Sequence, residues 1–117
     1  MSPANTGIYG GPEAALAGIV ESLAANLDPR KIWLLGSRAD GRARVDSDFD
    51  LLVVVKAEGV FGSTDYARVR APLRDLGVAC DVAACSAEVF EEERKYPHPF
   101  VGEILQRGRR VYASPTG

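Results

Sequence analysis

The stretch that decides the fold is GSRADGRARVDSDFDL, residues 36–51, because it joins two runs of apolar residues. Lys31 to Leu35 precedes it, and Phe49 to Val55 overlaps its end. Short apolar runs of this kind, rich in branched side chains and bounded by Gly, Ser and Asp, are typical of buried β-strands. The stretch is therefore expected to be a polar turn that leads from one strand into the next.

Two carboxylates, Asp48 and Asp50, stand at the start of the second expected strand. Side chains alternate between the two faces of a strand, so both carboxylates point the same way, roughly 7 Å apart along the chain. They repel each other unless a cation neutralises them, and Mg²⁺ takes carboxylate and phosphate oxygens as ligands. At the other end of the turn, Gly36 permits close approach of a ligand, and the Ser37 hydroxyl with nearby N–H groups suits phosphate oxygens.

A third carboxylate, Asp81, lies within another apolar run, VACDVAA at residues 78–84. A charged side chain is rarely buried without a partner or a metal. The neighbours of Asp81 on the same face, Ala79 and Ala83, are small and leave room above the sheet for a ligand. The alternative for Asp81 is an edge strand that turns it to water. For residues 36–37 and 46–48, taken singly, the alternative is ordinary turn or cap chemistry.

Helical periodicity accounts for most of the remaining chain. Helices are expected from Pro12 to the Asp28-Pro29 stop, over residues 63–76, from Ser86 onward and over residues 100–106, with a final extended segment at 109–112. The resulting order, α-β-β-α-β-α-α-β, predicts one mixed α/β domain. We expect a flexible N-terminal tail over residues 1–11, a single domain over 12–113, and a C-terminal tail over 114–117.

Composition narrows the class of protein. The 117 residues include 14 Lys plus Arg against 16 Asp plus Glu, a net charge of −2, and 46% are hydrophobic, which is typical of a globular domain. No apolar run reaches the ~20 residues of a membrane helix, and no secretory signal is visible. Cys80 and Cys85 form neither a disulfide framework nor a zinc motif. We therefore expect a cytoplasmic protein, without membrane contact and without a broad basic face for nucleic acid.

The two motifs together resemble a known signature. Gly36-Ser37 followed by Ser47-Asp48-x-Asp50-Leu51 is similar to the signature of the nucleotidyltransferase superfamily that includes DNA polymerase beta. The spacing is most similar to the minimal nucleotidyltransferase (MNT, MntA-like) branch, and the resemblance extends from Ile32 to Tyr112. It implies a small mixed sheet backed by helices, and an enzyme that transfers a nucleoside monophosphate from a nucleoside triphosphate, ATP above all.

The resemblance also implies roles for individual residues. Asp48, Asp50 and Asp81 match the catalytic carboxylates that bind Mg²⁺ or Mn²⁺, and the nucleotide-binding positions are Gly36, Ser37 and Arg38. Asp81 would further help to deprotonate the hydroxyl that attacks the α-phosphorus. One residue departs from the family pattern, because Asp40 stands where these proteins often carry a basic residue.

A partner protein is the remaining implication. Members of the MNT branch act as antitoxins in HEPN/MNT-type toxin–antitoxin pairs, so the resemblance implies a HEPN-like partner whose hydroxyl group is adenylylated. The chain ends soon after the expected core, so the acceptor is expected to come from another molecule. The alternative is a catalytically weak binding module that neutralises its partner by steric contact. The third interpretation is a small α/β domain with coincidental acidic turns. The intact set of three carboxylates weighs against the binding module.

Overall fold

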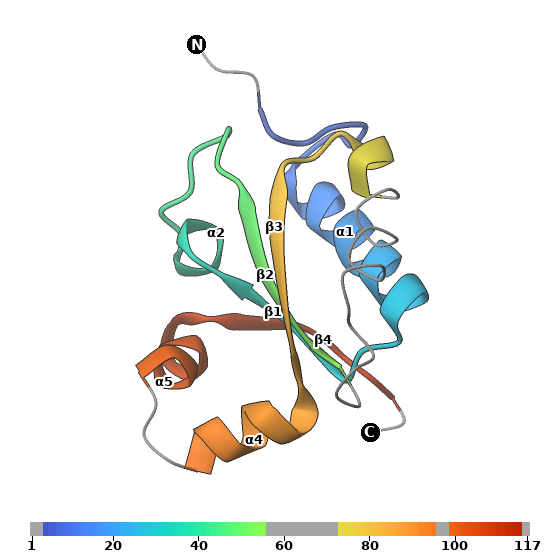
Figure 1. Ribbon diagram of the computed structural model, residues 1–117. Helices are drawn as coiled ribbons and strands as arrows, with labels where there is room; N and C mark the ends of the chain where they lie inside the picture. The colour runs from blue at the N-terminus through green and yellow to red at the C-terminus, as the bar shows by residue number, and fades with distance from the viewer. Residues whose placement is uncertain (1–3, 56–72, 96–98, 116–117) are drawn as a thin grey trace.

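The structure is a computed structural model that describes residues 4–55, 73–95 and 99–115 (Figure 1). Within these ranges, one sheet has the strand order β3-β2-β1-β4. Its strands are β1 (Lys31–Leu35), β2 (Phe49–Val55), β3 (Cys80–Ser86) and β4 (Arg109–Ala113). β1 is antiparallel to both β2 and β4, whereas β2 and β3 are parallel. The predicted mixed α/β fold is confirmed.

Helix α1 (Pro12–Leu27) covers one face of the sheet. It begins at Pro12 because the first helical position needs no N–H donor, and it ends at Asp28, whose φ of 46° is left-handed. Its buried residues recur every four positions and are Ala15, Ile19, Leu23 and Leu27. They pack against the inward side chains of β1 and β2, among them Ile32, Leu34, Phe49, Leu51 and Val53. Each large side chain buried in this way contributes about 1.5–3 kcal/mol, so this layer is the main core.

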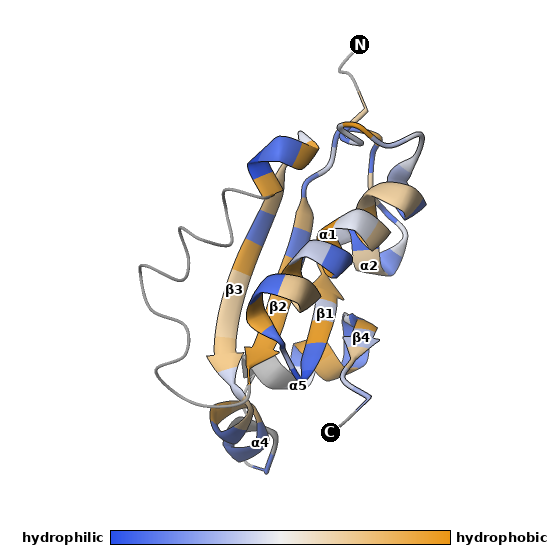
Figure 2. Cartoon of the chain, turned by 90° about the vertical axis from the view of Figure 1, so that its right-hand side faces the viewer, coloured by the Kyte–Doolittle hydropathy of each residue, from blue (hydrophilic) through white to orange (hydrophobic). Residues whose placement is uncertain are grey.

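Helices α4 (Ala87–Lys95) and α5 (Pro99–Arg107) enclose a smaller core with the opposite face of the sheet. Its buried residues are Leu52, Val54, Phe90 and Ile104. The Ser86 hydroxyl accepts a hydrogen bond from the Val89 N–H at 3.1 Å and so caps the start of α4. Figure 1 places α5 on the side of the sheet away from α1, and Figure 2 shows that most of β2 is hydrophobic.

Three segments differ from expectation or lie outside the described residues. The polar turn after β1 contains a short helix, α2 (Ser37–Asp40), because Gly36 adopts a φ of +70° and its carbonyl accepts the N–H groups of Ala39 and Asp40. β3 begins two residues later than predicted. Most of the helix expected over residues 63–76 lies outside the described ranges, although residues 73–76 are helical. None of the described helices is both long enough and apolar enough to span a membrane.

The N-terminal segment, which the sequence predicts as a tail over residues 1–11, is hydrogen-bonded to the domain from Asn5 onward. The Asn5 N–H donates to the Val45 carbonyl at 2.7 Å, and the Ile8 N–H donates to the Leu76 carbonyl at 3.1 Å. Tyr9 packs against the main core. In this structure the described part of the segment therefore packs against the sheet and its loops.

Candidate active site

The parallel pair β2–β3 brings two of the three carboxylates side by side. Its register places Asp50 directly opposite Asp81, and residues paired in a ladder point to the same face of the sheet. Asp48 immediately precedes β2 and lies two residues from Asp50. The intervening Phe49 is buried in the core beneath α1. The three carboxylates therefore lie near the starts of two adjacent strands, on the face opposite α1.

The electrostatics of Asp50 reflect this crowding. Its pKa is raised above the ordinary value, first because partial burial disfavours the charged form, and then because the charges of Asp81 and Asp48 lie nearby. Asp50 is half-buried, whereas Asp48 and Asp81 are exposed to solvent. A bound cation would remove the repulsion that raises this pKa.

The carboxylates fit a hard divalent cation in their chemistry, although they do not enclose one. Among the described residues, no three His, Cys, Asp or Glu side chains are gathered into a ready metal site. Mg²⁺ is usually held by one or two carboxylates together with substrate phosphates rather than by a cage made only of protein. An open row of carboxylates supplies the protein's share of such a ligand set.

Gly36 lies against this row. Its φ of +70° and ψ of −154° belong to a region that is essentially restricted to glycine. A Cβ atom at this position would lie 2.7 Å from Oδ2 of Asp50, so any side chain here would displace that carboxylate. Close approach at Gly36 was expected for a ligand, and in the structure the nearest group is the Asp50 carboxylate itself.

Ser37 is the first residue of α2 and is half-buried. Gly36, not Ser37, occupies the N-cap position, and the helix has no side-chain cap. Within the described part of the chain, no hydrogen bond engages the Ser37 hydroxyl. The group is therefore available to a ligand at the end of β1.

The Arg38 side chain is hydrogen-bonded to the turn that immediately precedes Asp48. Its Nε and Nη2 donate to the Ser47 carbonyl at 3.2 and 2.9 Å, and Nη2 also donates to the Val45 carbonyl at 3.2 Å. The guanidinium carbon lies 4.4 Å above the Phe49 ring, within the range of a cation–π contact. These contacts brace the residues that immediately precede the carboxylate pair. The predicted contact of Arg38 with nucleotide stays a prediction.

Asp40, the residue that departs from the family pattern, is paired. Its Oδ2 accepts from Nη2 and Nε of Arg42 at 2.6 and 3.0 Å, and its Oδ1 accepts the Arg42 backbone N–H at 3.2 Å. The hydrogen bond from Arg42 lowers the pKa of Asp40, and Asp40 raises the pKa of Arg42. The negative charge expected near the phosphates therefore has its own counter-ion.

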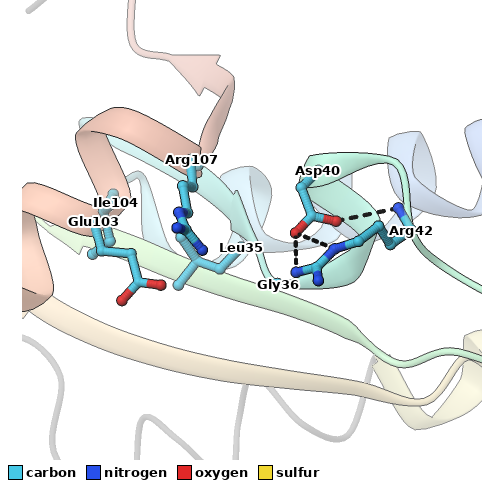
Figure 3. Close-up of a pocket in the computed structure, with 8 residues that line it drawn as sticks. Leu35, Gly36, Asp40, Arg42, Glu103, Ile104 and Arg107 are labelled. Atoms are coloured by element: carbon cyan, nitrogen blue, oxygen red, sulfur yellow. Dashed lines mark hydrogen bonds and ion pairs between the residues drawn. The ribbon is translucent and has the colours of Figure 1, made fainter.

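A cavity of about 230 Å³ opens between α2 and α5, next to Gly36 (Figure 3). Its lining consists of Leu35, Gly36, Asp40, Arg42, Glu103, Ile104, Arg107 and Gly108. In Figure 3 the Arg107 side chain points toward Leu35, while the Asp40–Arg42 pair lies on the other side of Gly36. Sequence reasoning missed Glu103 and Arg107, because no motif marks them. Their spacing of four residues on one helix face was the available signal.

A second hollow, of about 300 Å³, lies at the β3 edge of the sheet. Asp48 and Asp81 contribute to its wall, together with Arg74, Cys80 and several apolar residues. The sheet order β3-β2-β1 thus puts one hollow beside Asp81 and the other beside Gly36, with Asp50 between them. The row of carboxylates can therefore lie between two bound groups, one in each hollow.

Comparison with known proteins points to one family. A family model described as "Polymerase beta, Nucleotidyltransferase" matches residues 18–116. No curated protein is similar enough in sequence to count as a relative. A toxin–antitoxin structure with AMP-PNP superposes with a TM-score of 0.59 at 14% identity, covering 86% of this chain and 74% of that one.

Two further structures share the fold. A mutant of the toxin–antitoxin MntA–HpeT has a TM-score of 0.57 at 13% identity, with 84% of this chain and 73% of that one covered. A protein from Sulfolobus solfataricus, named as a nucleotidyltransferase, has a TM-score of 0.53 at 20% identity and covers 95% of this chain and 96% of its own. At these identities the likeness is one of fold.

Proposed function

Because the chain belongs to the polymerase beta nucleotidyltransferase family, we propose that it transfers AMP from ATP to a hydroxyl group on a partner protein. The observation that carries the proposal is the register of β2 and β3, which sets Asp50 opposite Asp81 with Asp48 beside them. A purely structural sheet gains nothing from three like charges on one face, whereas a divalent cation and a triphosphate would neutralise them.

In this proposal the nucleotide lies at the Gly36 side of the row. Gly36 and the Ser37 hydroxyl hold phosphate oxygens, and the triphosphate extends into the cavity between α2 and α5. Two arginines line this cavity, and Arg42 forms an ion pair with Asp40. Arg107 forms no ion pair with a described residue, so its guanidinium can bind phosphate. A guanidinium binds phosphate oxygens through two parallel hydrogen bonds, which suits Arg107 to the leaving phosphates.

The acceptor enters from the other side, through the hollow beside Asp81. Its hydroxyl oxygen forms a bond to the α-phosphorus, the bond from that phosphorus to the bridging oxygen breaks, and pyrophosphate leaves on the Gly36 side. Asp81 takes the hydroxyl proton. Mg²⁺ or Mn²⁺ held by Asp48, Asp50 and Asp81 would neutralise the charge of the phosphates. Such chemistry depends on positioning and charge neutralisation more than on covalent catalysis.

The partner is inferred from the structural neighbours. Two of them are toxin–antitoxin proteins, one of them holding AMP-PNP. We assign this chain the antitoxin role in a HEPN/MNT-type pair, with a HEPN-domain toxin as the acceptor. A protein acceptor supplies its own wall around the reacting hydroxyl and fixes its orientation through the interface.

A second candidate function is neutralisation of a partner by contact alone. An apolar groove of about 530 Å³ lies between α1 and β4 and favours it. The groove is lined by Leu16, Ala17, Val20, Glu21, Ala24, Val111 and Tyr112. A partner held in this groove would be blocked without any transfer of nucleotide.

One experiment separates the two functions. The chain is incubated with ATP, Mg²⁺ and the proteins that co-purify with it from its native host, which are then examined by mass spectrometry. An AMP adduct on a co-purified protein that is absent with Asp48→Asn supports nucleotidyl transfer. If the Asp48→Asn variant still neutralises its partner protein although no AMP adduct forms, the contact mechanism is supported. Efficient transfer to a small alcohol by the isolated chain would contradict a protein acceptor.

A further inference from the structure

The N-terminal segment contributes one side chain to the framework of the candidate site. Asn5 Nδ2 donates to the carbonyls of Ser47 and Ala79, at 2.9 and 2.8 Å, and its Oδ1 accepts the Ala79 N–H at 2.7 Å. Its backbone N–H adds the bond to Val45. One residue therefore makes four hydrogen bonds that bridge two segments far apart in the sequence.

Both segments lead directly to the carboxylates. Ser47 immediately precedes Asp48, and Ala79 precedes Asp81 by two residues. The Ala79 carbonyl also accepts the Phe49 N–H at 3.2 Å, which is the bond that leads into the parallel β2–β3 ladder. Asn5 thus lies at the point where the two strands begin to separate.

Arg38 reaches the same carbonyl of Ser47 from α2. Asn5 links that carbonyl to Ala79, which immediately precedes β3. Arg38 links it to α2, which follows β1, and also stacks on Phe49. A loop held from only one side would be free to pivot, and a displacement of 1 Å near reacting groups can cost a large factor in rate.

We propose that Asn5 is a positioning residue that sets the spacing between Asp48 and Asp81 by fixing the backbone before each of them. The inference rests on the proposed function for its consequence, and on the hydrogen bonds alone for its geometry. Asn5 lies outside residues 18–116, the part of the chain that the family model matches. It makes no contact with substrate in this scheme and acts only through the two strand ends.

The test compares Asn5→Ala with Asn26→Ala. Asn26 is an exposed residue of α1 whose Nδ2 also donates to a backbone carbonyl, that of Ser22 at 2.8 Å, so it controls for loss of an asparagine hydrogen bond elsewhere. Two quantities are measured: the affinity for AMP-PNP in the presence of Mn²⁺, and the hydrogen-exchange rates of the Phe49 and Ala79 amides. Asn5→Asp keeps the acceptor for the Ala79 N–H and serves as the second variant if Asn5→Ala does not fold.

The expected result for Asn5→Ala is faster exchange at both amides and roughly tenfold weaker nucleotide binding in the presence of Mn²⁺, the lower end of the loss expected when a residue that orients metal-binding side chains is removed. Asn26→Ala should change neither. Unchanged exchange and unchanged affinity in Asn5→Ala would overturn the inference; where Asn5→Ala does not fold, unchanged Phe49 exchange and unchanged affinity in Asn5→Asp would do so. If the wild-type chain does not bind AMP-PNP at all, the proposed function fails, while the exchange rates still decide whether Asn5 fixes the two strand ends.

Discussion

Asp50 lies opposite Asp81 in the register of the parallel strands β2 and β3, and the carboxylate of Asp50 also fills the space beside Gly36. Asp50 and Asp81 are therefore built into the sheet, and Asp48 immediately precedes β2. Regular strands position side chains more precisely than loops do, which favours a site that must align phosphates with an attacking hydroxyl. Because the carboxylates repel one another, loss of a negative charge from one of them should change both the stability of the chain and its binding of metal.

Removal of the paired charges should abolish the response to metal. Mg²⁺ or Mn²⁺ should raise the melting temperature of the wild-type chain, because a ligand that binds only the folded state stabilises it, by about 2.7 kcal/mol at a hundredfold excess over Kd. In the double variant Asp48→Asn with Asp50→Asn this rise should disappear while the chain still folds. Thermal melts with and without metal measure it. A full response in the double variant would show that the pair is not the metal site.

The raised pKa of Asp50 predicts a pH-dependent cost to stability. Folding raises this pKa above the ordinary value of 3.8, so the native state binds the proton more tightly than the unfolded state does. The free energy of unfolding therefore decreases as the pH rises through the folded pKa, and the penalty is full above it. Asp50→Asn should stabilise the metal-free chain at neutral pH and leave it unchanged below about pH 3.8.

Urea melts of both proteins across this pH range measure the difference. The variant loses the half-buried charge together with its repulsion from Asp81 and Asp48, so its gain should vanish in acid. A gain that persists unchanged at low pH would show that packing, and not charge, is responsible.

Gly36→Ala should damage both stability and the carboxylate row. The backbone at this position is in a glycine-only conformation, and the added Cβ would meet Oδ2 of Asp50 at 2.7 Å. We expect a loss of about 1–3 kcal/mol in the free energy of unfolding, together with loss of the metal response. Gly41→Ala is the matched control, since Gly41 also has a positive φ, +82°, but nothing lies within 4 Å of its Cβ position. Equal effects of the two substitutions on the metal response would contradict the contact with Asp50.

Ser37→Ala should weaken nucleotide binding without changing stability. The hydroxyl does not cap α2, so its removal should leave the free energy of unfolding within about 0.5 kcal/mol. Its loss from a phosphate site should instead reduce affinity for ATP with Mg²⁺. A denaturant melt and a nucleotide titration on the same variant measure the two effects. A stability loss of roughly 0.5–2 kcal/mol with unchanged nucleotide affinity would assign Ser37 to capping instead.

Much of this site could be predicted from the sequence because its strands are marked by local pattern. β1 and β2 have the bounds that their apolar runs predict, 31–35 and 49–55, since Gly36 follows the first run and Asp48 precedes the second. Alternation within β2 and within β3 correctly indicates which residues share a face. The exact pairing of Asp50 with Asp81 could not be predicted, because the register of strands distant in sequence depends on the packing of the whole sheet.

The parts that could not be predicted depend on long-range hydrogen bonds. Helix α2 has only four residues, too few for any periodicity, and its start depends on the backbone of Gly36. The sequence marks Arg38 as a charge beside a phosphate motif, but only the folded turn shows its bonds to Ser47. Asn5 stands in a segment of small residues that resembles a tail, and its partners are 42 and 74 positions away.

Arg107 is a cavity residue outside the signature motif, and we expect it to bind phosphate. If it binds the leaving phosphates, Arg107→Gln should weaken ATP binding by roughly tenfold, the size expected when one charge-assisted hydrogen bond to phosphate is lost. Arg107→Lys should recover part of the affinity, because lysine keeps the charge and loses the two-pronged geometry. Arg110→Gln is the control, since Arg110 is an exposed arginine on β4 that does not line the cavity. Titrations with ATP and AMP separate the contact further, because only ATP carries the terminal phosphates. Equal loss of affinity for both nucleotides would place Arg107 at the base or ribose instead, and equal effects of Arg107→Gln and Arg110→Gln would reduce the contact to general electrostatic attraction.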